Sequence, residues 1–117
     1  MYSAEILDHF QHPRNTGDLE APASSVQMEN PACGDILKLS LKLEGCRIAD
    51  IRFRAQGCVP AIACGSAVTE LAKGKTVEEA RQISREDLLR KVGGVPEAST
   101  HASHLAIDTL KALLRGL

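Results

Sequence analysis

The residues of this sequence that can do chemistry lie at three places far apart along the chain. Cys33 and Asp35 flank a glycine in the stretch NPACGD, Cys58 follows another glycine, and His101 and His104 lie near the end. Thiolates and imidazoles are good ligands for zinc and, with sulfide, for iron. The alternative for each thiol is a buried side chain without chemistry, since free cysteine is among the most buried residue types.

Spacing alone leaves both alternatives open. The cysteines are Cys33, Cys46, Cys58 and Cys64, and no two of them form a C-x2-C pair. The separation of Cys58 from Cys64 is not a zinc-knuckle spacing. In a reducing cytosol such scattered cysteines bind metal, act chemically or sit buried, rather than form disulfides.

The candidate ligands are predicted to lie at the ends of secondary-structure elements. Apolar and polar residues alternate over 36–43 and again over 48–56, which predicts an antiparallel hairpin with one solvated face. The side chains expected to face inward are Leu37, Leu39, Leu41 and Leu43 on the first strand and Ala49, Ile51, Phe53 and Ala55 on the second. Cys33 then precedes the first strand and Cys58 follows the second.

Helices are predicted on both sides of this hairpin. Their expected ranges are 2–11 with Ser3 as N-cap, 61–71 after Pro60, 77–83 with Thr76 and Glu79 as a capping box, 85–92 with Ser84 as N-cap, and a last helix from residue 97 or 99. A short strand is expected over 26–29. Since strands come first and helices later, the fold class is α+β, with helices packed on one face of a small antiparallel sheet.

Composition argues against several classes of function. A formal net charge of −1 and 3% aromatic residues give neither the basic surface nor the stacking platforms of a nucleic-acid-binding protein. No apolar run approaches the ~20 residues of a membrane span, and the N-terminal stretch has no secretory pattern, so we expect a cytoplasmic protein. No nucleophile–base pair or phosphate-cradling glycine loop is visible, which argues against an enzyme.

Several motifs together resemble the scaffold family of iron–sulfur cluster assembly, known as the IscU type or the NifU N-terminal domain. They are YSAEILDHFQHPRNTG, NPACGD, FRAQGC, TELAKGKTVEEA and HASHLAIDTLKAL, which cover nearly the whole chain. The resemblance implies a single domain over residues 1–117, with a three-stranded antiparallel sheet and helices on one face. It also implies a protein that binds and transfers its cargo.

The resemblance further implies an assembly site. In this family three cysteines, an aspartate and a histidine surround that site, and Cys33, Asp35, Cys58 and His101 match four of these positions. They would bind iron, zinc or a [2Fe–2S] cluster. By the same resemblance, the partners are a cysteine desulfurase and iron–sulfur acceptor proteins.

One position departs from the family's pattern. The family's histidine precedes a third cysteine, the usual acceptor of sulfur from the desulfurase, and this chain has Ala102 there. A methyl group can neither carry sulfur nor bind iron. His104 and Cys64 are candidates for the missing ligand, and a homodimer sharing a cluster would supply it from the partner. The family's LPPVK segment before this motif is also changed, to VPEAS.

Three functions therefore stay open on the sequence. The first is a scaffold or carrier in which Asp35 is a weak, exchangeable ligand and thiolates near a bound cation have lowered pKa values. The second is a divergent paralogue without assembly activity, whose fold zinc stabilises. The third is a thiol carrier that accepts sulfur on Cys58 or Cys64.

Overall fold

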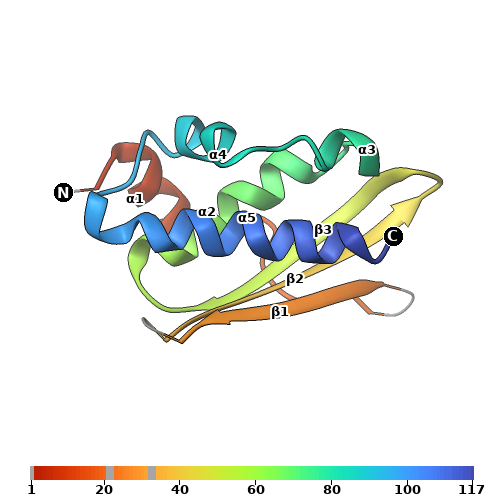
Figure 1. Ribbon diagram of the computed structural model, residues 1–117, viewed down its shortest axis with the longest axis horizontal. Helices are drawn as coiled ribbons and strands as arrows, with labels where there is room; N and C mark the ends of the chain where they lie inside the picture. The colour runs from red at the N-terminus through yellow and green to blue at the C-terminus, as the bar shows by residue number, and fades with distance from the viewer. Residues whose placement is uncertain (1, 21–22, 32–33) are drawn as a thin grey trace.

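The computed structural model describes residues 2–20, 23–31 and 34–117, and in this part of the chain it has one sheet and helices on one side of it. The strands are β1 (Ser24–Asn30), β2 (Asp35–Glu44) and β3 (Arg47–Gln56), antiparallel in the order β1-β2-β3. The helices are α1 (Ala4–Gln11), α2 (Val59–Ala72), α3 (Val77–Ala80), α4 (Arg85–Lys91) and α5 (Thr100–Arg115), with a turn of 3-10 helix, η1 (Glu97–Ser99), before α5. Figure 1 shows α2 and α5 next to the sheet, with α3 and α4 beyond them. The predicted α+β class is confirmed.

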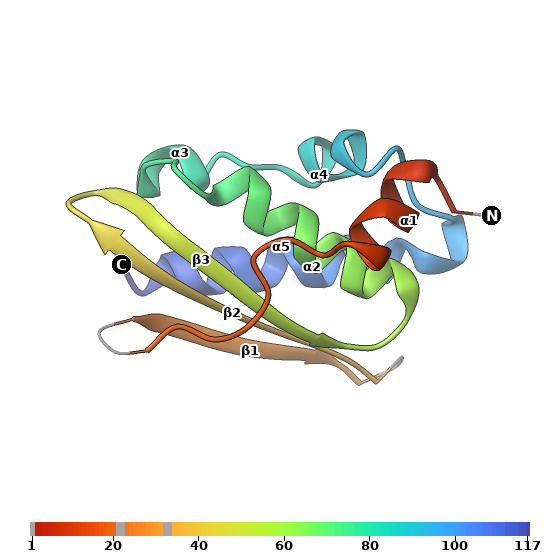
Figure 2. The ribbon, with the colours of Figure 1, turned by 180° about the vertical axis from the view of Figure 1, so that it is seen from behind.

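Local signals set the starts of the helices as predicted. Ser3 accepts a hydrogen bond from the N–H of Ile6, and Thr76 and Ser84 each begin a capping box. However, α3 ends at Ala80, not at residue 83. The reason is that Ser84 must be extended to cap α4, so the chain leaves α3 early. Figure 2 shows the two short helices following one another along the far side of α2.

The register of β2 and β3 is interrupted near their turn. Lys42 pairs with Asp50, but Leu43 pairs with Ile48, so Ala49 is the extra residue of a β-bulge. Ile48 is fully buried, whereas Ala49 and Leu43 are exposed. The expectation that Leu43 and Ala49 face inward was therefore wrong, because a one-residue shift moves side chains to the other face of a strand.

The core lies between the sheet, α2 and α5. It includes Leu37, Leu39, Leu41, Ile51, Phe53, Val68, Leu110 and Leu114. Gly65 lets α2 approach closely, since a Cβ there would lie 2.8 Å from the ring of Phe53. In the described part of the chain, no helix has both the length and the apolar character needed to cross a bilayer.

The segment after α1 covers the outer edge of β3. The N–H of Gly17 donates to the carbonyl of Phe53 at 2.9 Å, and the N–H of Phe53 donates to the carbonyl of Asn15 at 2.8 Å. The N–H of Arg14 donates to Ser66 Oγ of α2 at 2.9 Å. The first two bonds pair the backbone N–H and C=O groups that β3 would otherwise expose as an edge strand. The third joins the end of α1 to α2.

Candidate metal centre

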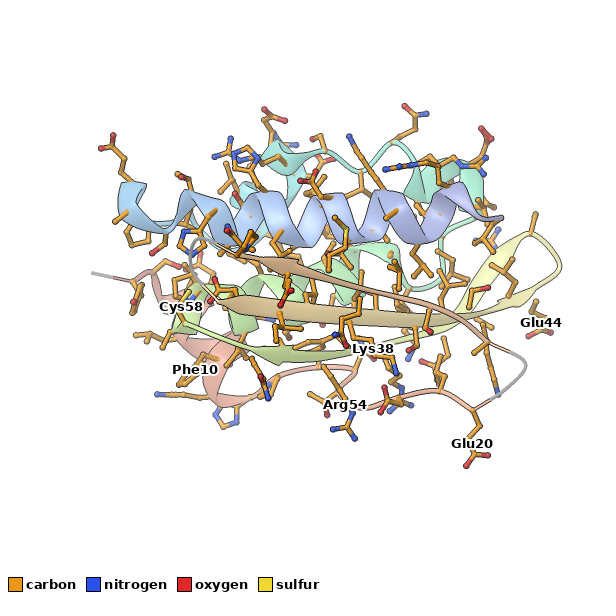
Figure 3. All side chains as sticks on the ribbon, turned by 60° about the horizontal axis from the view of Figure 1, so that its bottom comes forward. Phe10, Glu20, Lys38, Glu44, Arg54 and Cys58 are labelled. Atoms are coloured by element: carbon orange, nitrogen blue, oxygen red, sulfur yellow. The ribbon has the colours of Figure 1, made fainter. Side chains whose placement is uncertain are left out.

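Three of the predicted ligands meet at one end of the sheet. Asp35 begins β2, Cys58 is the N-cap of α2, and His101 lies in the first turn of α5. One ligand atom from each lies within 4.8 Å of the other two. Figure 3 shows Cys58 at this end, where β3 passes into α2. Residues separated along the chain thus form one cluster, which we call the ligand triangle.

The ligand triangle is close in size to one face of a tetrahedral metal site. Asp35 Oδ2 is 3.0 Å from His101 Nε2 and 3.6 Å from Cys58 Sγ, and Sγ is 3.8 Å from Nε2. Tetrahedral bonds to sulfur, nitrogen and oxygen place ligand atoms about 3.3 to 3.8 Å apart. The two distances to Cys58 Sγ lie in this range, whereas Asp35 and His101 are at ion-pair distance and would have to separate by a few tenths of an ångström around a cation.

Asp35 is held in the triangle by Gly57 and Cys58, the two residues between β3 and α2. Its side chain is 3% exposed, and its Oδ1 accepts the N–H of Cys58 at 3.3 Å. Gly57 makes this approach possible, because it has a φ of +147° and a Cβ there would lie 2.3 Å from Asp35 Oδ1. The sequence analysis did not identify this role of Gly57, although the glycine lies directly before Cys58 in the FRAQGC motif.

The environment of Cys58 favours its neutral thiol when no cation is bound. Burial raises the pKa of this thiol, and the Asp35 carboxylate raises it further. A cation bound to the triangle acts in the opposite direction, since it stabilises the thiolate. Binding of a metal is therefore coupled to release of the thiol proton.

Cys33, the fourth predicted ligand, lies outside the described residues. The chain on one side of it ends in Asn30 and Pro31, and on the other Gly34 leads directly into Asp35. The N–H of Gly34 donates to the carbonyl of Asn30 at 2.8 Å. This bond draws the ends of β1 and β2 together beside the triangle.

The residues that follow His101 on α5 are buried and fix its first turn. Ala102 is 1% exposed. Ser103 Oγ donates to the carbonyl of Thr100 at 2.8 Å and accepts from Arg85 Nε of α4 at 2.9 Å. The sequence analysis missed this link from α4, because nothing local connects Arg85 to Ser103. His104 is exposed and is outside the metal-ligand group found among the described residues.

The other two thiols of the described residues are not members of the ligand triangle. Cys64 is fully buried in α2, and burial raises its pKa to about 12. Its environment fits a core side chain rather than a ligand or a carrier of sulfur. Cys46 is exposed in the turn between β2 and β3. Figure 3 shows Glu44, two residues before it, at the opposite end of the molecule from Cys58.

The chain is similar to a known family and to curated proteins along nearly its whole length. Residues 1–115 match the family described as NifU-like N terminal domain. The iron–sulfur cluster assembly scaffold protein IscU 1 of Archaeoglobus fulgidus is 45% identical over 111 residues, which cover 95% of this chain and 72% of that protein. IscU of Escherichia coli K12 is 40% identical over 118 residues, with coverage of 97% and 91%.

Solved structures share the fold. A candidate iron–sulfur cluster assembly scaffold protein for the SUF system from Fervidobacterium islandicum AW-1 has a TM-score of 0.82, at 22% identity, with coverage of 97% and 96%. The N-terminal part of a NifU-like protein from Brucella abortus has a TM-score of 0.73, at 17% identity, with coverage of 97% and 91%. These likenesses confirm the predicted three-stranded sheet with helices on one face.

Proposed function

Because the chain belongs to the NifU-like N-terminal domain family, we propose that it is an assembly scaffold or carrier that binds iron or an iron–sulfur cluster through the ligand triangle. The observation that carries this proposal is the triangle itself, with ligand atoms 3.0, 3.6 and 3.8 Å apart. Its IscU relatives are named scaffold proteins, which fits a protein that holds and passes on a cargo without turnover. We propose that the 117 residues form one functional domain.

Each member of the triangle has a distinct role in this proposal. Cys58 supplies a soft thiolate and His101 an imidazole nitrogen, both good ligands for iron with sulfide or for zinc. Asp35 supplies a harder carboxylate oxygen, the ligand that iron bound to sulfide holds least firmly. Asp35 would therefore leave first when a [2Fe–2S] cluster is transferred. Cys33 is proposed as the fourth ligand from the sequence.

A zinc-stabilised paralogue without assembly activity is the second candidate. Ala102 favours it, since the chain has an alanine where the family has its third thiol. Thiolate, imidazole and carboxylate are also the ligand types that zinc prefers. In that case a chelator would lower the melting temperature of the zinc-loaded protein. A thiol carrier would have to use Cys58, because Cys64 is fully buried.

The partners proposed are a cysteine desulfurase and iron–sulfur acceptor proteins. Leu7 and Phe10 of α1 are 41% and 38% exposed. Figure 3 shows Phe10 at the same end of the molecule as Cys58, so a partner that contacts α1 would bind at the end of the molecule that carries the triangle. Thiol ligands must stay reduced, which suits a reducing compartment such as the cytoplasm.

Anaerobic reconstitution tests the proposal. The full chain is incubated with ferrous iron and sulfide, and visible absorption is followed while iron and sulfide per chain are counted. We expect a cluster in the wild type and in Cys46→Ala, and its loss in Cys58→Ala and Cys33→Ala. Failure of the wild type to form a cluster while it still binds zinc would overturn the scaffold proposal in favour of the zinc-stabilised paralogue.

A further inference from the structure

The outer face of the sheet, opposite the helices, carries a hollow of about 370 Å³. Its lining residues come from all three strands: Gln27, Ile36, Lys38, Arg54, Ala55 and Gln56. Figures 1 and 2 show the helices packed on the other face. The size is within the range of sites for small molecules.

The lining is rich in hydrogen-bond donors, and the acidic side chains beside it are Asp18, which contacts both of its cations, and Glu29 of β1, which pairs with Ile36. Lys38 and Arg54 supply an ammonium and a guanidinium, and Gln27 and Gln56 supply amides. Within the described residues neither glutamine side chain makes a hydrogen bond, and Arg54 makes its hydrogen bond through Nε alone. The terminal nitrogens of the guanidinium therefore keep their donor capacity for another acceptor.

A carboxylate of the chain itself already binds this pair of cations. Asp18 lies on the segment that follows the edge of β3, and its Oδ1 is 3.0 Å from Lys38 Nζ while its Oδ2 is 2.5 Å from Arg54 Nε. The hydrogen bond from Lys38 lowers the pKa of the Asp18 carboxyl, and Arg54 acts in the same direction. The two cations are thus spaced to share one acidic group.

Another anion can compete with Asp18 for Lys38 and Arg54, because the ion pairs are exposed. Its side chain is 41% exposed and that of Arg54 is 67% exposed, and exposed ion pairs contribute little to stability. An anion that also reaches the amides of Gln27 and Gln56 gains contacts that Asp18 does not make. Such a ligand replaces Asp18 at little cost to the fold.

We propose that this hollow binds a small anion whose acidic group, carboxylate or phosphate, displaces Asp18 from Lys38 and Arg54. This site is separate from the ligand triangle, because Lys38 and Arg54 pair with one another on the outer face of the sheet, whereas Asp35 is buried on the side of the helices. The proposal does not depend on metal binding, so it stands or falls independently of the scaffold function.

Titration of the full-length, metal-free chain with succinate and, separately, with inorganic phosphate tests this proposal. Calorimetry gives the affinity, and amide NMR locates the site. We expect saturable binding of at least one probe, with shifts concentrated at Asp18, Gln27, 36–38 and 54–56. The probe that binds more tightly identifies the acidic group. Absence of saturable binding by both probes would overturn the proposal.

Matched variants separate this site from general attraction of anions. Lys38→Gln and Arg54→Gln should each weaken binding about tenfold, because each removes a charge-assisted hydrogen bond. Lys42→Gln, on the same face of β2 outside the hollow, should leave binding unchanged. Asp18→Asn should tighten binding, whereas Glu44→Gln, an equal change in charge at the far end of β2, should not. Equal effects of each variant and its control would overturn the proposal.

Discussion

The two ends of the β2–β3 pair each carry a cysteine in a different setting. At one end Cys58 is half-buried beside the carboxylate of Asp35 and the imidazole of His101. At the other end Cys46 is exposed in a turn, and no metal-ligand group of the described residues includes it. A thiol next to a strand end is therefore not enough to make a site. The two cysteines differ in the side chains that tertiary packing places beside them.

Two long helices begin at the first end. Cys58 is the N-cap of α2, a helix of 14 residues, and His101 is the second residue of α5, a helix of 16 residues. The backbone N–H groups at the start of α2 act to lower the pKa of the Cys58 thiol, against the larger effect of burial, and they add to the stabilisation that a bound cation would give to the thiolate. At the other end, among the described residues, the helix that begins next to Cys46 is α3, of four residues, whose Val77 N–H donates to the carbonyl of Cys46 at 2.8 Å. That contact uses the backbone and leaves the thiol in solvent.

The largest effect on the metal site is expected from substitution of Gly57, compared with the same substitution at Gly45 at the other end of the pair. In Gly57→Ala the new Cβ would overlap Asp35 Oδ1 at 2.3 Å, so the carboxylate must leave the triangle. We expect loss of iron binding and a fall of about 2–4 kcal/mol in the free energy of unfolding. Gly45→Ala is the matched control, since Gly45 also has a positive φ of 65° but nothing within 4 Å of the new Cβ. It should cost about 1–2 kcal/mol and keep iron binding. Urea unfolding and iron titration measure both effects, and retained iron binding in Gly57→Ala would contradict the role of Gly57.

Replacement of the exchangeable ligand should have the next largest effect. In Asp35→Ala a reconstituted cluster should live longer and pass about tenfold more slowly to an apo acceptor protein, because the weak ligand is gone. Stopped-flow absorption during transfer gives the rate. Transfer at the wild-type rate would show that Asp35 does not control release.

An effect of similar size is expected from Ser103, which we propose to position His101. Ser103→Ala removes the hydrogen bonds to Arg85 and to the Thr100 carbonyl, and should weaken metal affinity about tenfold through misplacement of the imidazole. Thr109→Ala is the control on the same helix, since it removes a buried hydroxyl bonded to the Leu105 carbonyl at 2.6 Å. Both should lose about 1 kcal/mol of stability, but only the first should lose affinity. Equal affinities in a competition assay with a metal indicator would argue against the positioning role.

The smallest effect concerns acid stability at the site end, where α1 packs on α2. His9 is 5% exposed, its Nδ1 lies 2.8 Å from Ser66 Oγ, and burial lowers its pKa below 6.5. Because the unfolded chain binds the proton more readily, stability should be complete above the unfolded pKa and fall as the pH decreases toward the folded pKa. Melting temperatures between about pH 7.5 and about pH 5.5 should show this fall in the wild type and less of it in His9→Gln. The exposed His12→Gln should behave as the wild type, and an equal slope in His9→Gln would exclude His9 as the cause.

The sequence by itself determined the elements and the kinds of ligand. Alternation over β2 and β3 and the capping residues Ser3, Thr76 and Ser84 were enough to predict the fold class. The resemblance of the motifs around Asp35, Cys58 and His101 to a known family implied three members of the cluster. The strands and caps depend on residues within a turn or two of one another, so a local pattern carries them. The role of Cys33 as a ligand remains a prediction from the sequence.

Only the tertiary structure decided which side chains meet. It placed Cys58 against Asp35, 23 positions away, and against His101, 43 positions away. It enclosed Cys64, and it shifted Ala49 outward through a bulge. Such outcomes depend on how the sheet and the helices pack, and on close approaches such as that of Gly57 to Asp35. Local periodicity describes each element separately, and the distances between elements follow from core packing.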